Sequence, residues 1–181
     1  MRLLASCILL SAVLAAQSPQ ADISGMPESR GVYYHAPSGW IGLPANPLLG
    51  FREGSTRWLL GVGGGDAIAE IPGPHSQVQL PSSRPIFHLR GYSGANALYL
   101  VRETEKLDYR EIRMPYTRDF HNFTRFRAQD MVELDLASAG DGILTLTPKT
   151  DLKPGEYAIV SMAEPGMLGI RLSFDFGVVG H

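Results

Sequence analysis

Apolar and polar residues alternate most regularly near the end of the chain, in residues 169–178. One side of the alternation carries Ile170, Leu172, Phe174, Phe176 and Val178, and the other carries Arg171, Ser173, Asp175 and Gly177. A period of two residues is typical of a β-strand with one buried face and one face in water. The pattern therefore predicts a strand that leaves Asp175 on its solvent side.

Two further strands are predicted just before this one, in residues 143–147 and 156–162. The stretch from Tyr157 to Val160 is apolar on both faces, which is typical of a central strand. Between the two strands, Pro154 and Gly155 predict a type II turn, because proline fixes φ at the first turn position and glycine accepts a positive φ at the next.

Shorter stretches of the same kind recur along the rest of the chain. The predicted strands are residues 57–62, 67–71, 77–80, 85–90 and 131–136, together with two hairpins, 32–35 with 40–43 and 97–104 with 109–114. Residues 44–55, rich in proline and glycine, are predicted to form a loop. About ten short strands indicate an all-β chain. We expect an antiparallel β-sandwich, with a partly open β-barrel as the alternative and at most one short helix near residues 118–128.

The first sixteen residues have the anatomy of a secretory signal peptide. Arg2 supplies a positive start, residues 3–14 form an apolar run too short to span a bilayer, and small residues follow at Ala15 and Ala16. We therefore expect export to the periplasm or to the outside of the cell. The expected mature chain has a flexible lead-in at residues 17–30 and a single β-sandwich domain at residues 31–181.

Cys7, the single cysteine of the chain, lies inside this apolar run. Residues 4–7 match the letters of a bacterial lipobox, so a lipoprotein anchored through Cys7 is an alternative. A lipobox follows the apolar segment, whereas here that segment continues for seven residues beyond the cysteine, which favours a signal peptide. The mature chain would then contain no disulfide, thiol nucleophile or thiolate metal site.

The composition provides enough apolar side chains for a sizeable core. The 181 residues are 44% hydrophobic and 19% charged. The formal net charge is −2, and loss of Arg2 with the signal peptide would make it −3. This mild acidity gives no support to nucleic-acid binding. No transmembrane span is expected in the mature chain.

Three short motifs match catalytic or nucleotide-binding patterns in their letters. Residues 61–66 (Gly-Val-Gly-Gly-Gly-Asp) lack the ending of a P-loop, and residues 91–95 (Gly-Tyr-Ser-Gly-Ala) are one residue short of a nucleophile elbow. Residues 175–177 (Asp-Phe-Gly) match the kinase metal-binding triplet, but no kinase catalytic loop accompanies them. We interpret the three motifs as a turn, a linker and strand residues.

The remaining ionisable residues predict neither a metal site nor a cofactor. The five histidines form no H-x-H or H-x-x-x-H pair. Glu103, Glu105, Asp108 and Glu111 are predicted on a solvated hairpin, whereas a glycosidase needs two carboxyls facing each other across a cleft. Within that hairpin, one strand face carries Leu98, Leu100 and Arg102, and the other carries Tyr99, Val101 and Glu103.

The strongest candidate for a binding site is the stretch from Met114 to Asp130. Four of its aromatic residues recur at spacings of four, three and three, which would place them on one face of a helix, with arginines beside them. Aromatic rings stack on sugar or base faces, and arginines hold anionic groups. The candidate ligand-binding residues are Tyr116, Arg118, Phe120, Phe123, Arg125, Phe126 and Arg127. The alternative is a short helix or loop that caps an open end of the sandwich, with arginines paired to Asp119 and Asp130.

A second group of aromatic residues would also suit a carbohydrate platform. Its members are Trp40, Trp58, Tyr33, Tyr34 and Tyr92. Aromatic residues in short strands more often belong to the core, and we favour that interpretation.

The C-terminal region resembles the ending of uncharacterised exported proteins of environmental bacteria. The residues that carry the resemblance are 141–148 (Asp-Gly-Ile-Leu-Thr-Leu-Thr-Pro), 152–158 (Leu-Lys-Pro-Gly-Glu-Tyr-Ala) and 175–178 (Asp-Phe-Gly-Val). The resemblance implies a shared fold but no catalytic residues, because none are established for such proteins.

These features predict an exported, non-enzymatic all-β domain with a binding or structural role in the cell envelope or outside the cell. The alternative is a carbohydrate-binding or carbohydrate-active protein that uses residues 116–127 or the tryptophans. The expected partner is a glycan or an envelope protein, and not nucleic acid.

Overall fold

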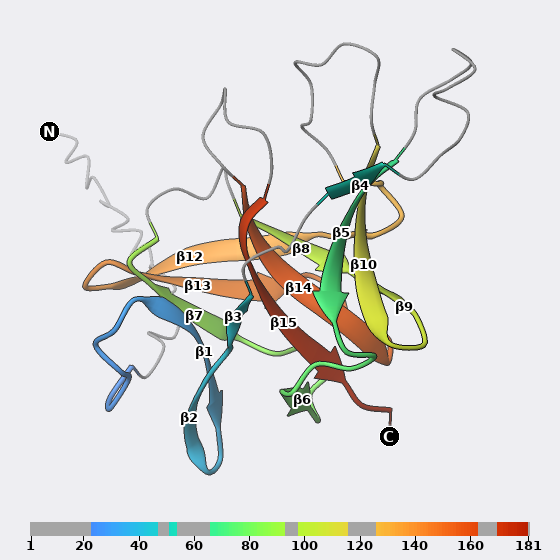
Figure 1. The fold of residues 1–181 in the computed structure, drawn as a ribbon. Coiled ribbons are helices and arrows are strands. Elements are labelled where there is room, and N and C mark those ends of the chain that lie inside the picture. The colour runs from blue at the N-terminus through green and yellow to red at the C-terminus, as the bar shows by residue number, and fades with distance from the viewer. Residues whose placement is uncertain are drawn as a thin grey trace, which may run out of the picture.

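The computed structural model describes residues 23–46, 51–53, 66–92, 98–115, 126–162 and 170–180. Within these residues the chain is all-β, with fifteen strands in three sheets and no helix (Figure 1). The pairings are antiparallel except that β6 (Gln79–Leu80) runs parallel to β15 (Ile170–Val178). The fold is a β-sandwich with one more layer than a two-sheet sandwich has.

Among the described strands, none of the three sheets closes into a barrel. The first sheet has the order β12 (Leu134–Gly140), β13 (Ile143–Pro148), β7 (Phe87–Arg90), β1 (Gly31–Ala36) and β2 (Gly39–Gly42). The central sheet has the order β11 (Met131–Val132), β8 (Leu98–Arg102), β14 (Gly155–Met162), β15 and β3 (Ala45–Asn46), with β6 beside β15. The third sheet has the order β4 (Phe51–Glu53), β5 (Asp66–Pro72), β10 (Tyr109–Pro115) and β9 (Thr104–Glu105).

The larger apolar core lies between the first sheet and the central sheet. Phe87 from β7 meets Phe176 from β15 with ring centroids 4.7 Å apart, and Tyr157 from β14 stacks on Phe176 at 5.8 Å. The other buried members include Val32, Leu80, Leu89, Leu98, Leu100, Leu146, Leu152, Ile159, Phe174 and Val178. Burying these side chains is the main source of stability at this interface.

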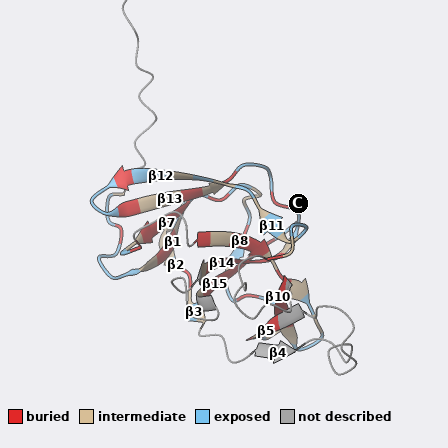
Figure 2. Cartoon of the chain, turned by 90° about the horizontal axis from the view of Figure 1, so that it is seen from above, coloured by how far each residue is buried: buried red, intermediate tan, exposed pale blue. Residues whose placement is uncertain are grey.

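The opposite face of the central sheet packs against the third sheet. Its apolar contacts join Val101, Ala158 and Val160 of the central sheet to residues of β5 and β10, including Ile71 and Ile112. The central sheet is therefore buried on both faces (Figure 2). This corrects the predicted wet face of β15: Asp175 is only 2% exposed, because the third sheet covers it.

The hairpin predicted from residues 97–104 and 109–114 forms only at its turn end, where Thr104 pairs with Glu111, and the prediction is wrong for residues 98–102. β8 pairs with β14 and β11 in the central sheet, whereas β10 pairs with β5 and β9 in the third sheet. Glu103 lies between β8 and β9, where the chain passes from one sheet to the other. Alternation identifies the residues of a strand and its two faces, but it does not identify the partner strand.

Other predicted elements agree more closely with the structure. The hairpin of β1 and β2 turns between Ala36 and Gly39, and β13, β14 and β15 match the three strands predicted at the C-terminal end. The predicted strand 131–136 is divided at Glu133 into β11 and β12, which belong to different sheets. The predicted loop 44–55 contains the short strands β3 and β4. The strand predicted at 57–62 lies outside the described residues.

The N-terminal part of the described chain packs on the outer face of the first sheet. Met26 is buried with Tyr33 and Ile143, and the indole Nε1 of Trp40 donates a hydrogen bond to the carbonyl of Ser24. Residues 23–30 therefore contact the domain, whereas the signal peptide predicted at 1–16 lies outside the described residues. In the part of the chain that the structure describes, no helix has the length and apolar character needed to cross a bilayer.

Candidate functional site

Four charged side chains lie buried between the central sheet and the third sheet. Glu103, Arg110, Glu156 and Asp175 are each at most 5% exposed, and we refer to them as the ionic cluster. Glu103 follows β8, and the other three lie on β10, β14 and β15. Because an ion taken out of water loses its hydration, the pairing of these groups decides what the cluster can do.

Arg110 lies between two of the carboxyl groups. Its Nη2 donates a hydrogen bond of 2.5 Å to Oδ2 of Asp175, and the side-chain amide of Asn46 donates to Oδ1. Its Nε lies 2.8 Å from Oε2 of Glu103. Asp175 thus accepts hydrogen bonds from two side chains, whereas Glu103 lies against the Nε of Arg110. Asp175 therefore has better donors than Glu103.

Glu156 is held by donors from the segment before β6 and from the first residue of β6. The main-chain N–H of Ser76 donates to Oε2 at 2.8 Å, and the amide of Gln79 donates to Oε1 at 3.2 Å. Nδ1 of His75 lies 3.2 Å from the same oxygen, and this histidine is largely exposed at the edge of the ionic cluster. These donors replace the water that the carboxylate loses on burial.

Burial raises the pKa of Glu103 to about 8. Desolvation is the largest cause, and the carboxylates of Asp175 and Glu156 raise the pKa further, whereas the guanidinium of Arg110 opposes them without cancelling their effect. One guanidinium does not neutralise two acids in a buried site, and Asp175 has the stronger contacts. Glu103 is therefore mainly protonated at pH 7.

The ionic cluster is closed to substrates in this structure. A carboxyl with a raised pKa suits general acid catalysis, provided that a substrate can reach it. The side chain of Glu103 is fully buried, and none of the four residues lines the open cleft described next. We interpret the ionic cluster as a network that holds the third sheet on the central sheet.

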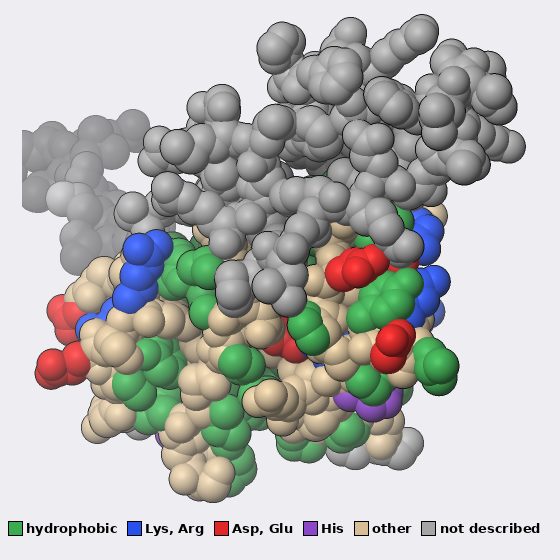
Figure 3. All heavy atoms as spheres, viewed as in Figure 1, with side chains coloured by type: hydrophobic (Ala, Val, Ile, Leu, Met, Phe, Trp, Pro, Cys, Tyr) green, Lys and Arg blue, Asp and Glu red, His purple; other side chains and the backbone are tan. Residues whose placement is uncertain are grey.

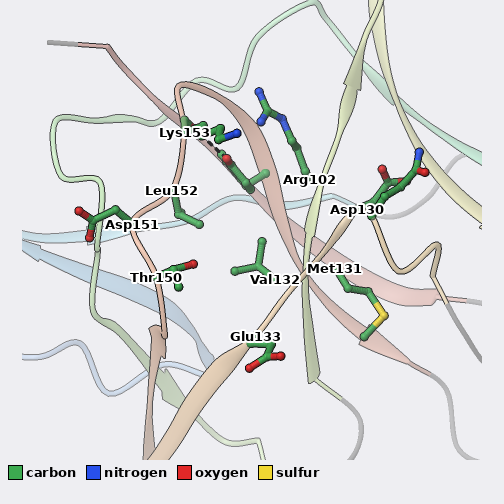
Figure 4. Close-up of a pocket in the computed structure, with 11 residues that line it drawn as sticks. Arg102, Asp130, Met131, Val132, Glu133, Thr150, Asp151, Leu152 and Lys153 are labelled. Atoms are coloured by element: carbon green, nitrogen blue, oxygen red, sulfur yellow. Dashed lines mark hydrogen bonds between the residues drawn. The ribbon is translucent and has the colours of Figure 1, made fainter.

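An open cleft of about 520 Å³ lies at one end of the interface between the first sheet and the central sheet (Figure 4). Its walls are residues 129–133, which run through β11 to the start of β12, and residues 150–153, where the chain returns from β13 to β14. Both segments connect the same two sheets. The cleft lies between them, next to the hydrogen bond from the N–H of Lys149 to the carbonyl of Glu133.

The cleft has an apolar floor and a charged rim. Leu152 and Tyr157 belong to the apolar core below it, and Val132 packs against that core. The rim carries two cations and three acids. They are Arg102, Lys153, Asp130, Glu133 and Asp151. A concave site with an apolar floor and a few polar groups is typical of small-molecule binding.

The rim charges differ in their pairing. Asp130 forms a 2.6 Å ion pair with Arg127, and Glu133 lies 3.4 Å from Nζ of Lys149. Within the described residues, neither Arg102 nor Lys153 has a carboxylate within 4.0 Å. Two of the three acids thus have a positively charged partner, whereas neither cation of the rim has a negatively charged partner among the described residues.

Arg102 is held in place by neutral groups. Its Nη2 donates a hydrogen bond of 2.8 Å to the carbonyl of Pro154, and its guanidinium carbon lies 5.7 Å from the ring centroid of Tyr157. Gly155 begins β14 with a φ of +143°, a conformation that favours glycine. A Cβ on Gly155 would lie 2.8 Å from Nη2 of Arg102, so the glycine also makes room for the guanidinium.

The surface away from the cleft mixes charges of both signs. Figure 3 shows acidic and basic side chains side by side over β9 and β10. Lys106 there lies 3.8 Å from Glu111, and Arg113 donates to the same carboxylate. The carboxylate of Glu111 is buried and is held by these two neighbouring cations, so the pairs indicate no ligand.

Most of the predicted aromatic and arginine patch lies outside the described residues. Tyr116, Arg118, Phe120, Phe123 and Arg125 are in this group, so the patch remains a prediction. Two predicted residues, Phe126 and Arg127, are described.

Phe126 is buried and packs against Tyr99, with ring centroids 5.3 Å apart, on the third-sheet side of the central sheet. Arg127 pairs with Asp130, as the capping alternative predicts for one of its arginines, and this contact lies at the edge of the cleft.

The second aromatic group does not form one platform among its described members. Tyr34 and Tyr92 pack in or against the core between the first and central sheets, whereas Tyr33 and Trp40 belong to the cluster on the outer face of the first sheet. Tyr33 and Tyr92 are buried, as the interpretation as core residues predicts, whereas Tyr34 and Trp40 are only partly buried. Trp58 lies outside the described residues.

The sequence did not identify the residues that form the two polar sites. The predicted solvated hairpin is wrong for Glu103 and Glu111, which are both buried, while Glu105 and Asp108 are exposed. One available signal was the strand face that Glu103 shares with Tyr99 and Val101, because a carboxylate in line with two apolar residues indicates burial on the same side. No comparable signal marks Arg102 and Lys153.

Neither a metal site nor a similarity to known proteins assigns a function to the described residues. Within the described ranges, no three histidine, cysteine or acidic side chains are grouped so that they could hold a metal ion. Comparisons of the chain with models of protein families, with curated proteins and with solved structures found no match.

Proposed function

We propose that the chain is an exported, non-enzymatic binding domain whose ligand occupies the cleft. The observation that carries the proposal is an open cleft, built on the core of a β-sandwich, in which Arg102 and Lys153 have no acidic partner among the described residues. Among the described residues, its lining contains no serine, histidine or cysteine, which are the side chains most often used as nucleophile and general base. The one carboxyl with a strongly raised pKa, Glu103, lies elsewhere and is enclosed.

Export is supported by the predicted signal peptide and by the resemblance of the C-terminal region to exported bacterial proteins. Mass spectrometry of the protein recovered from its native host tests this part. A mature chain that starts near Ala16 or Gln17 supports export through the signal peptide, whereas a lipid-modified Cys7 would support anchoring as a lipoprotein.

Binding in the cleft is tested by thermal unfolding in the presence of a panel of organic acids, amines, neutral glycans and short peptides. A ligand at a hundred times its Kd stabilises the native state by about 2.7 kcal/mol, which corresponds to a rise in Tm of about 5–10 °C for a domain of this size. Thr150→Trp should abolish the rise, because Thr150 is an exposed residue that lines the cleft.

Ser138→Trp is the matched control for this experiment. Ser138 is also exposed, but it lies on β12 and does not line the cleft. Ligands that stabilise both tryptophan variants equally would place binding elsewhere and reject the proposal. Turnover of any panel compound would reject the non-enzymatic role.

A second candidate function is carbohydrate binding through the predicted patch. It is favoured by the contact between Arg127 and Asp130, which joins the end of that patch to the edge of the cleft. The double change Phe120→Ala with Phe123→Ala should then weaken retention on a glycan array, and unchanged retention would reject this candidate. Thr150→Trp on the same array tests whether the cleft shares in glycan binding.

A further inference from the structure

The structure assigns a ligand class to the cleft: a small organic anion whose acidic group lies between Arg102 and Lys153 and whose apolar part covers Val132 and Leu152. This inference rests on the proposed function, because it names the chemistry that the same cleft would recognise. Three features carry it, namely the grouping of the cations, the anchoring of Arg102 and the apolar floor.

The two cations are grouped at one end of the cleft. In Figure 4, Arg102 and Lys153 lie together, Glu133 lies at the opposite end, and the apolar side chains of Val132 and Leu152 lie between them. The acid at the far end is paired with Lys149. Of the other two acids in the lining, Asp130 is paired with Arg127, and Asp151 forms no ion pair with either cation. An anion that enters at the end where Arg102 and Lys153 lie would therefore form contacts that neither cation has with an acid of the described chain.

Arg102 is prepared for an anion before the anion arrives. The carbonyl of Pro154 accepts a hydrogen bond from one of its N–H groups, and the ring of Tyr157 lies beside the guanidinium. A guanidinium has five N–H donors, so donors remain for a ligand. A side chain that is already held loses less conformational entropy when it binds. The planar fork of the guanidinium matches a carboxylate, which can accept two parallel hydrogen bonds.

The floor of the cleft selects against an anion with no apolar part. Leu152 and Tyr157 continue directly into the core between the first sheet and the central sheet. Apolar surface that a ligand covers there is removed from water, which favours binding. A volume of about 520 Å³ falls in the range of small-molecule sites. Inorganic phosphate would satisfy the cations but leave this floor in contact with water.

The test uses 4-phenylbutyrate, its neutral amide 4-phenylbutyramide and inorganic phosphate, with the mature full-length chain. Binding is followed by chemical shifts of main-chain amides, which remain measurable for weak ligands. We expect 4-phenylbutyrate to shift residues 129–133 and 150–153, and to bind about tenfold or more tightly than the amide, since hydrogen bonds to charged groups are the stronger ones. Its Kd should rise with ionic strength, because the rim is open to solvent.

Single changes test the two cations. Lys153→Gln should raise the Kd of 4-phenylbutyrate about tenfold and leave the Kd of the amide unchanged, and Lys153 is exposed, so the variant is expected to fold. Arg102→Gln should act in the same direction. Lys149→Gln is the matched control: it removes the same charge from an exposed residue near the cleft, but Lys149 is paired with Glu133 and does not line the cleft. Lys149→Gln should change the Kd of 4-phenylbutyrate less than twofold.

Several outcomes would overturn the inference. Equal affinity for the acid and the amide would make the cations irrelevant, and phosphate binding as tight as 4-phenylbutyrate would reduce the site to a simple anion site. An unchanged Kd of 4-phenylbutyrate in Lys153→Gln would reject direct contact between Lys153 and the ligand. An equally large rise of the Kd in Lys149→Gln would reject it too. The proposed function fails separately: it is rejected if no panel ligand responds to Thr150→Trp, and it survives if amines or neutral glycans respond while the anions do not.

Discussion

The two faces of the central sheet are both buried, but they are held by different forces. Towards the first sheet the contacts are aromatic and aliphatic, with Phe176 at their centre. Towards the third sheet, a smaller apolar patch lies beside the ionic cluster. A face of a sheet can therefore be buried without being mainly apolar. The faces can be compared directly because residues next to each other on β14 and β15 point to opposite sides.

The largest effect should come from removing the cation of the ionic cluster. Arg110→Met leaves the carboxylate of Asp175 buried without its positive partner, so we expect a loss of about 3–5 kcal/mol in the free energy of unfolding. Urea denaturation measures it. Lys149→Met is the control, because Lys149 forms an exposed pair with Glu133 and should cost about 1 kcal/mol or less. Similar losses in the two variants would show that the cluster contributes no more than a surface ion pair.

The next effect depends on pH and involves Glu103. Its carboxyl ionises near 4.5 in the unfolded chain and at about 8 in the folded one. Between these values the unfolded state binds fewer protons than the folded state, so stability falls as the pH rises from about 4.5 to about 8. Since a difference of one in pKa corresponds to about 1.4 kcal/mol, the loss from this group is on the order of a few kcal/mol.

Glu103→Gln should remove that loss, because a neutral amide replaces a carboxyl that is neutral in the folded state. Free energies of unfolding of the variant and of the native chain, measured from pH 4.5 to pH 8.5, should therefore diverge as the pH rises, with the variant the more stable at the upper end. Glu105→Gln is the control at an exposed site two residues away. A constant difference between Glu103→Gln and the native chain would contradict a raised pKa.

A change at the start of β14 tests the edge where the apolar interface opens into the cleft. Gly155→Ala places a Cβ 2.8 Å from Nη2 of Arg102 at a φ of +143°, and we expect a cost of about 1–3 kcal/mol. Gly39→Ala is the control, since its φ is +117° and a Cβ there would have nothing within 4 Å. The excess cost at Gly155 measures the displacement of Arg102. Equal costs would show that Arg102 moves aside freely.

The smallest effect compares packing on the two faces directly. Ile159→Val removes one methylene from the interface with the first sheet, and Ile112→Val removes one from the interface with the third sheet, and both residues are fully buried. Each should cost about 0.5–1.5 kcal/mol, as measured by chemical denaturation. Equal costs would locate the difference between the interfaces in their charges, whereas a clearly smaller cost at Ile112 would show that the third sheet is also the more loosely packed.

The sequence predicts one face of the central sheet better than the other. Alternation places Leu98 and Leu100 opposite Tyr99 and Val101, and the structure confirms this division. The alternation pattern fails at Asp175, because it does not distinguish an aspartate that is buried with a partner from one that is exposed to water. That partner, Arg110, is 65 positions away, and no local pattern connects the two.

The cleft could not be predicted for a related reason. Arg102, Glu133 and Lys153 come from three separate segments that the sheets bring together. Each looks like an ordinary surface residue in its own stretch of sequence. The feature that distinguishes the cations, the lack of an acidic partner among the described residues, exists only once the neighbours are in place.

The ionic cluster also has a consequence for the order of folding. β14 and β15 are consecutive strands that pair along their whole length, whereas the bond between Arg110 and Asp175 closes across 65 positions. Local pairings form before distant ones, because long loops cost more entropy to close. We therefore expect Arg110→Met to accelerate unfolding in stopped-flow experiments while leaving the folding rate close to that of the native chain. Docking of the third sheet would then be a late event, and a slowed folding rate would instead place Arg110 in the folding nucleus.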